Sequence, residues 1–232
     1  MTRQMHPLLR KAADAPADSV ERHLLVVAAV EAILDREVVL VGGAAVNVVT
    51  GTYLPTDIDL VASVTTEDRE QLVDSGFEWA GVGHRHLSLT MPDGEVILVE
   101  FPDAHLDAVL PPERIEVQPG ISISIISLDD LMMDRLKQTT DGTSVTLDAA
   151  VELASAAYAS IDWDWLGRRS VLPELEAIGV PGALATVRRE AKRSLRDRGR
   201  SIRGRAPMTA DGALLERGAR VVHEAPEDPE PV

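Results

Sequence analysis

Two aspartates, Asp57 and Asp59, stand two residues apart at the start of an apolar run, in the sequence TDIDLVA. If this run is a strand, its period of two places both carboxylates on the same face. Adjacent ionised carboxylates repel each other unless a cation lies between them, and their oxygens are preferred ligands of Mg²⁺ and Mn²⁺. The pair therefore indicates a divalent metal site, although two solvated acids opening a strand would look the same.

Two glycines, Gly42 and Gly43, follow an apolar run at 38–41 and precede a short helical pattern at 44–49. A strand, a glycine turn and a helix in this order let backbone approach a phosphate and point helix N–H groups at it. Tight turns need glycine for steric reasons as well. The glycines therefore predict a phosphate site only together with the aspartates.

Helical and strand patterns alternate around these residues, and they predict an α/β (α+β) chain with a mixed central sheet. Pro92, Asp93 and Gly94 form a turn triplet between two alternating arms, which predicts a hairpin. Ser127 is the expected cap of a later helix. The expected helices cover 19–35, 44–49, 66–74, 127–138 and 147–158, and the expected strands cover 38–41, 57–62, 84–91, 95–101 and 121–126.

The stretch VLVGGAAVNVVTGTYLPTDIDLV resembles the signature of the polymerase-beta-like nucleotidyltransferase superfamily. That signature is an apolar residue, Gly, Gly or Ser, a short gap, and then Asp-apolar-Asp-apolar; here 13 residues separate Gly43 from Asp57. Residues 38–158 look closest to small microbial members of the uncharacterised and abortive-infection toxin type. The resemblance implies a nucleotidyltransferase fold with a C-terminal helical extension, and a partner protein as in toxin–antitoxin pairs.

In this family a third carboxylate comes from a later strand, and Glu100 in VILVEF is the best match, ahead of Asp103 and Glu95. The resemblance implies that Asp57 and Asp59 hold Mg²⁺ or Mn²⁺ on the phosphates of a nucleoside triphosphate (NTP). It implies that Glu100 helps to bind a second ion and activates an acceptor hydroxyl. The expected reaction is transfer of a nucleoside monophosphate to RNA, protein or a small molecule, with release of pyrophosphate.

The resemblance also implies a set of nucleotide-binding residues. Many members have Ser after the first glycine, whereas Gly43 offers only its backbone N–H, which predicts a weaker grip on phosphate. On the helix at 127–138 either Arg135 or Lys137 is expected to reach the phosphates, since both cannot face the site well. The full expected set is Gly42, Gly43, Thr56, Arg135 and Lys137.

Composition excludes several classes of site and of protein. The 232-residue chain has no cysteine, so disulfides, thiolate zinc sites and cysteine nucleophiles are absent. No apolar run approaches the length of a membrane span, and no signal segment opens the sequence, so we expect a cytoplasmic protein without membrane contact. The net charge of −15, with only three lysines among 23 basic residues, resembles proteins adapted to high salt.

The charge is unevenly distributed along the chain, because residues 188–205 hold nine basic and two acidic side chains. An apolar stripe among the arginines of 181–202 predicts an amphipathic basic helix. Two interpretations stay open, a helix that neutralises the acidic core, which we prefer, and an electrostatic patch for RNA. We expect a nucleotidyltransferase core with an N-terminal helix at 1–158, a helical extension at 159–205, and an acidic, disordered tail at 206–232.

Two further pairs and one rival function complete the expectations. His84 and His86 share a strand face and fit a transition metal, but surface or core histidines are the preferred interpretation. Trp163 and Trp165 are expected to anchor the packing between the core and the C-terminal helices. The rival function is a non-catalytic regulatory partner that keeps the nucleotidyltransferase fold.

Overall fold

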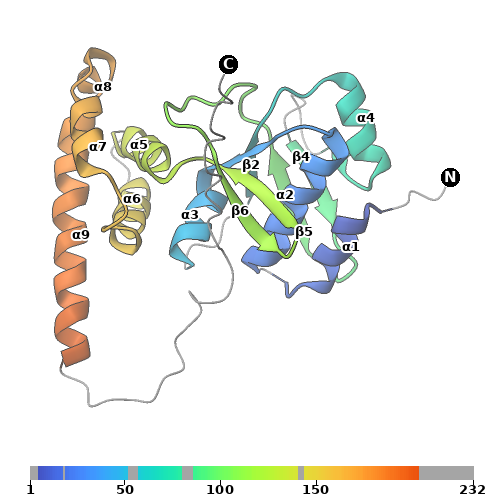
Figure 1. Ribbon diagram of the computed structural model, residues 1–232, viewed down its shortest axis with the longest axis horizontal. Coiled ribbons are helices and arrows are strands. Elements are labelled where there is room, and N and C mark those ends of the chain that lie inside the picture. Colours follow the sequence, from blue (N-terminus) through green and yellow to red (C-terminus); the bar gives the residue numbers. More distant parts are fainter. Residues whose placement is uncertain (1–4, 18, 52–56, 80–85, 141–143, 204–232) are drawn as a thin grey trace, which may run out of the picture.

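The computed structural model describes residues 5–203 except 18, 52–56, 80–85 and 141–143, and it leaves out the side chains of 198–203. Seven strands form one sheet and helices pack around it (Figure 1). The strands are β1 Val39–Val41, β2 Asp57–Val61, β3 Glu78–Trp79, β4 His86–Thr90, β5 Val96–Glu100, β6 Glu113–Gln118 and β7 Ile121–Ile125. The helices are α1 Pro7–Asp14, α2 Val20–Leu34, α3 Gly42–Thr50, α4 Thr66–Asp74, α5 Leu128–Thr139, α6 Ser144–Ala156, α7 Trp163–Ser170, α8 Pro173–Ala177 and α9 Val180–Arg203.

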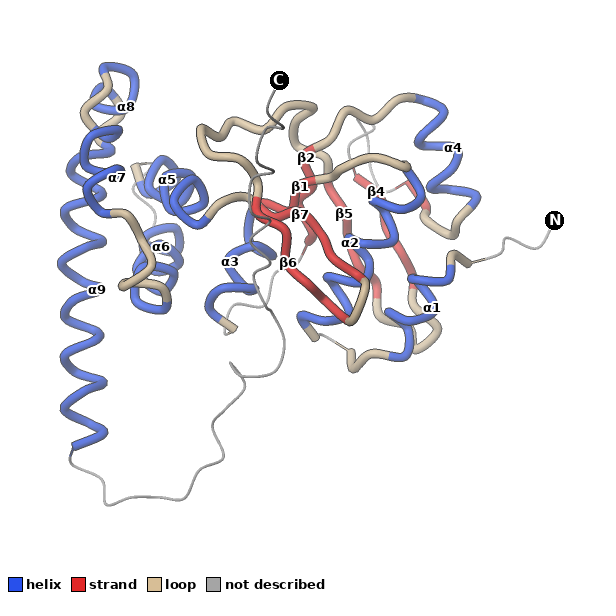
Figure 2. Tube along the Cα trace, in the orientation of Figure 1, coloured by secondary structure: helices blue, strands red, loops and turns tan. Residues whose placement is uncertain are grey.

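The strand order in the sheet is β3-β4-β5-β2-β1-β7-β6 (Figure 2). The sheet is mixed, because β1 pairs antiparallel with β2 but parallel with β7, and β2 pairs parallel with β5. This arrangement brings β2, the strand of the two aspartates, beside β5, which ends at Glu100. The expected α/β fold with a mixed sheet and flanking helices is confirmed.

The long helix α2 packs on the sheet and is buried along most of its length. Ser19 caps it by accepting a hydrogen bond from the N–H of Arg22, and the left-handed residue Asp35 (φ 49°) ends it. The guanidinium of Arg22 is itself buried, where it pairs with Asp93 and Glu95 of the β4–β5 turn. These ion pairs tie the start of α2 to the hairpin that ends at Glu100.

Helices α5 to α9 form a helical unit beside the sheet, and α5 and α6 lie between α9 and the strands (Figure 1). Trp163 of α7 packs against Tyr158 at 4.8 Å between ring centroids, and its indole N–H donates to the Tyr158 carbonyl. The guanidinium of Arg188 lies over the Trp163 ring, and that of Arg169 lies over Trp165. Both tryptophans thus pack within this unit.

Every expected helix and strand is present, with ends shifted by a few residues, and Ser127 caps α5 as predicted. The elements that the patterns did not predict are α1, β3, β6, α7 and α8. The division into core, extension and tail stays a prediction, and the expected tail lies outside the described residues. Within the described part of the chain, none of the helices combines the length and apolar character needed to cross a membrane.

Candidate active site

Three carboxylates meet where β2 and β5 run side by side. Asp57 and Asp59 alternate with the fully buried Ile58, so both point to the other face of the sheet, as a period of two predicts. The parallel register pairs Asp59 with Glu100. One carboxylate oxygen from each of the three residues lies within 4.8 Å of the other two. The cluster therefore brings together the predicted third carboxylate and the aspartate pair.

The other two candidates for the third carboxylate have different structural roles. Glu95 pairs with the buried guanidinium of Arg22 at the hairpin turn. Asp103 accepts hydrogen bonds from the N–H groups of Ala104 and His105, at 2.7 and 3.2 Å, and so shapes its own loop. Neither belongs to the cluster that Glu100 completes.

Gly42 makes the close approach of Asp59 possible. Its φ of +66° is in the left-handed region that favours glycine, and a Cβ at this position would lie 1.9 Å from Oδ2 of Asp59. The carboxylate therefore occupies the space that any other side chain would fill. The N–H of Gly43, at the start of α3, donates a hydrogen bond to Asp59. In this structure that N–H is directed at the carboxylate, whereas the sequence predicted a phosphate as its partner.

The pKa of Asp59 is raised to about 6. Burial is the largest cause, and the negative charges of Asp57 and Glu100 add to it. The charge of Arg135 and the hydrogen bond from Gly43 act in the opposite direction. A carboxylate in this environment is short of positive charge, which a cation among the three oxygens would supply.

The residues of the cluster fit a hard divalent cation. All three side chains are half-buried, each offers a carboxylate oxygen, and oxygen ligands are what Mg²⁺ and Mn²⁺ prefer. The face of the sheet that carries the three carboxylates is exposed to solvent along β5. Leu98 and Val96 lie on the same face of β5 as Glu100, and they are 39% and 55% exposed.

The two basic candidates on α5 differ in their surroundings. The largely buried side chain of Arg135 donates hydrogen bonds to Asp134. The positive charge of Arg135 also acts on Asp59, where it opposes the rise in pKa that burial and the other carboxylates cause. Lys137 instead donates to Asp107 at 2.8 Å, an aspartate whose side chain is 94% exposed, and lowers the pKa of that residue. Arg135 is therefore the cation whose charge reaches the carboxylates.

His86 is a neighbour of the carboxylate cluster. From the sequence it was interpreted only together with His84. It pairs with Glu100 across β4 and β5, and its Nδ1 lies 3.5 Å from Oε2 of Glu100. The proximity of His86 to Glu100 could have been predicted from the turn at 92–94, because a hairpin centred there places residue 86 opposite residue 100. Two other predicted residues, Thr56 and His84, lie outside the described residues.

No family model and no curated protein matches this chain. Among solved structures it is similar to an antigenic nucleotidyltransferase-like protein from Paracoccidioides brasiliensis, with a TM-score of 0.46 and 16% identity over 70% of this chain and 92% of the other. It is also similar to JHP933 from Helicobacter pylori (TM-score 0.36, 13% identity, covering 87% and 99%) and to the antibiotic-resistance factor ANT(2'')-Ia (TM-score 0.39, 13% identity, covering 81% and 95%). The TM-scores are low, so the chemistry of the site rests on its own geometry.

Proposed function

We propose that this protein is a metal-dependent nucleotidyltransferase that transfers a nucleoside monophosphate from an NTP to an acceptor hydroxyl. The observation that carries the proposal is the cluster of Asp57, Asp59 and Glu100, with oxygens within 4.8 Å of one another. The position of Gly42 supports it, because the turn beside the cluster is built around the carboxylate of Asp59. The signature that the sequence resembles contains the same glycines and aspartates.

In the proposed reaction, the acceptor oxygen forms a bond to the α-phosphorus of the NTP, and the bond from that phosphorus to pyrophosphate breaks. Asp57, Asp59 and Glu100 would hold divalent ions, which when bound would supply positive charge to the attacking and leaving oxygens. Asp57 and Asp59 would thereby favour binding of the nucleotide phosphates. Glu100 takes the proton of the acceptor hydroxyl, and Arg135 offsets negative charge near the phosphates.

The acceptor belongs to one of three classes, RNA, protein or a small molecule. The resemblance to abortive-infection toxins supports a toxin-like role with an antitoxin-like partner protein. Gly42 and Thr56 remain proposed nucleotide contacts. Gly43 would serve the nucleotide indirectly, through its hydrogen bond to Asp59.

The test is transfer of label from each α-labelled NTP, with Mg²⁺ or Mn²⁺, to cell RNA, protein or a hydroxylated small-molecule extract. Asp57→Ala and Asp59→Ala should each reduce transfer by at least about 100-fold, because several kcal/mol of charge stabilisation depends on them. Asp103→Asn is the matched control, since this nearby carboxylate lies outside the cluster, and it should leave transfer within about 3-fold of the parent. Transfer that survives both alanine substitutions would contradict the mechanism.

Metal binding can be measured separately by titrating Mn²⁺ and observing its paramagnetic resonance signal. The parent should bind Mn²⁺, and Asp57→Asn with Asp59→Asn should abolish binding, whereas Asp103→Asn should retain it. Metal binding without label transfer to any acceptor would instead favour the non-catalytic regulatory partner.

A further inference from the structure

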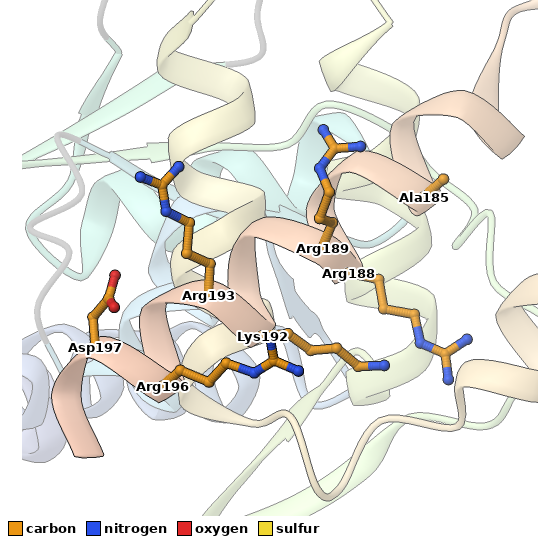
Figure 3. Close-up of a pocket in the computed structure, with 7 residues that line it drawn as sticks. All are labelled: Ala185, Arg188, Arg189, Lys192, Arg193, Arg196 and Asp197. Carbon is orange, nitrogen blue, oxygen red and sulfur yellow. The ribbon is translucent and has the colours of Figure 1, made fainter. Parts of the chain in front are cut away.

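The outward face of α9 gathers cations along one side of a helix (Figure 3). The opposite side holds the apolar residues Val180, Leu184, Val187 and Ala191, which are buried against the rest of the helical unit. The neutralising interpretation expected the arginines to lie on the acidic core, but the apolar stripe occupies the packed side. The residues that line the outward face are Ala185, Arg188, Arg189, Lys192, Arg193, Arg196 and Asp197.

Local pairing leaves this face strongly positive. Arg189 and Arg193 both pair with one carboxylate, Glu190 on the same helix, at 3.2 and 3.8 Å. The side chains of Arg189 and Arg193 are nevertheless 67% and 76% exposed, and ion pairs between such exposed groups are weak. Arg188 differs from the others, since it lies over Trp163 at the flank of the face. Arg189, Lys192, Arg193 and Arg196 therefore present their charge to solvent.

The acidity of the whole chain does not cancel this local charge. Residues 188–205 carry nine basic side chains against two acidic ones, although the net charge of the protein is −15. At physiological ionic strength exposed charges more than about 8 Å apart are largely screened from each other. A ligand at α9 therefore experiences mainly the charges close to it, where four exposed cations outnumber Asp197 on the face and Asp148 of α6, which lines an adjoining hollow with Arg193.

We propose that the outward face of α9 binds the phosphodiester backbone of RNA, on a surface separate from the carboxylate cluster. Arginine guanidinium groups bind phosphate through paired hydrogen bonds, and four exposed cations within three helical turns suit a chain of regularly spaced phosphates. Among the described residues that line it, the face has no aromatic or amide side chain to read bases, so binding is independent of sequence. The choice of RNA over DNA rests on the proposed function, in which RNA is one class of acceptor.

Two other polyanionic partners fit less well. An amphipathic helix binds a membrane by inserting its apolar face, but in α9 the apolar residues from Val180 to Ala191 are buried against the rest of the protein, which leaves Leu195 as the exposed large apolar side chain among those described. An acidic protein partner would need an apolar or aromatic anchor at the centre of its interface. On this face Ala185 is the sole apolar lining residue among those that the structure describes.

The test measures the affinity of the full chain for labelled oligo(U) by fluorescence anisotropy at two salt concentrations. For four phosphate contacts on a single strand, raising salt from about 50 to about 200 mM should weaken binding about 50-fold. Arg193→Gln with Arg196→Gln removes two contacts and should reduce that loss to about 7-fold. The matched control is Arg10→Gln with Lys11→Gln, two exposed cations of α1, and it should behave as the parent does.

The possible outcomes separate this site from the proposed reaction. Asp57→Asn with Asp59→Asn should bind oligo(U) as the parent does, so a failure of RNA binding and a failure of catalysis would be recognised independently. The proposal is overturned if the parent does not bind, if binding is insensitive to salt, or if both double variants weaken it equally. Tighter binding to duplex DNA, to phosphatidylserine vesicles or to polyglutamate than to oligo(U) would also overturn it.

Discussion

The carboxylate cluster at β2 and β5 and the outward face of α9 both place like charges side by side, but in different surroundings. Asp57, Asp59 and Glu100 are half-buried, and rigid strands fix them on one face of the sheet. Arg193 and Arg196 lie on the outer side of a helix, and water reaches both. Repulsion between like charges is therefore costly in the half-buried carboxylate cluster, whereas on the exposed face of α9 water reduces it.

This difference separates the kinds of ligand that the two regions suit. Half-buried carboxylates that repel one another gain most from a small cation that fits among their oxygens, which makes the site demanding in geometry. Exposed cations suit a flexible polyanion that needs no fixed geometry. Substitutions in the cluster should therefore have large and position-dependent effects, and substitutions on the helix face should have small and additive ones.

The strongest test of the geometric constraint is Gly42→Ala. The added methyl group must occupy the space of the Asp59 carboxylate, and the φ of +66° adds strain of about 1 kcal/mol. We expect label transfer to fall at least about 100-fold, and the free energy of unfolding to fall by about 3 kcal/mol. Transfer assays and chemical denaturation would measure the two effects.

Gly51→Ala is the matched control, because Gly51 has the same φ of +66° but nothing within 4 Å of the added Cβ. It should lose only the strain energy, about 1 kcal/mol, and keep its activity. In the Asp59→Ala background the stability cost of Gly42→Ala should shrink, which tests the clash even where the single variant folds poorly. Equal costs for the two glycine variants would show that the approach of Asp59 is not the constraint.

The period of two and the glycine turn made much of this site predictable from sequence. Alternation around Ile58 places Asp57 and Asp59 on one face whatever the rest of the fold is. The resemblance identified Glu100, and the parallel pairing of β2 with β5 explains why that residue is close. Long helices such as α2 were equally clear, because an extended apolar pattern is a local signal.

The features that the sequence did not predict depend on tertiary contacts. The strand β6 is a mostly polar edge strand with two apolar residues, Ile115, which is buried, and Val117, which is partly buried. So short an alternating pattern is a weak signal within its own segment. The choice between Arg135 and Lys137 depends on the rotation of α5 about its axis, which its packing against α6, α9 and α3 fixes. The hydrogen bond from Gly43 to Asp59 depends on how α3 meets β2. No pattern within one element contains that information.

The two sides of α9 give a second test of the contrast. Val187→Ala removes two methyl groups from a fully buried position, and it should lower the free energy of unfolding by about 2 kcal/mol. Arg193→Gln with Arg196→Gln should change it by less than about 0.5 kcal/mol, because both side chains are exposed. Urea denaturation of both variants would measure this. A larger loss from the arginine variant would mean that these cations stabilise the fold.

Arg135 and Lys137 offer a smaller test, within one helix. Removing the charge of Arg135 beside Asp59 should raise the KM for NTP about 10-fold in Arg135→Gln. Lys137→Gln removes an equal charge whose partner Asp107 is exposed, so KM should change less than about 2-fold. Steady-state kinetics with label transfer would compare them. If the two substitutions raise the KM for NTP equally, both cations contact the phosphates, and the different surroundings of Arg135 and Lys137 do not determine their roles.

The smallest expected effect is a dependence of stability on pH that originates in the cluster. The pKa of Asp59 is about 6 in the folded protein and close to 4 in an unfolded chain, so the folded state binds the extra proton between these values. Stability therefore falls as pH rises from about 4 to about 6. Asp59→Asn has no such proton, and in EDTA it should gain on the order of 1 kcal/mol over the parent across this window, an amount reduced by partial exposure. A saturating divalent cation stabilises the charged form of the parent and should cancel the gain in stability of Asp59→Asn. If the difference in stability between the two proteins changes with neither pH nor metal, it originates outside the carboxylate cluster.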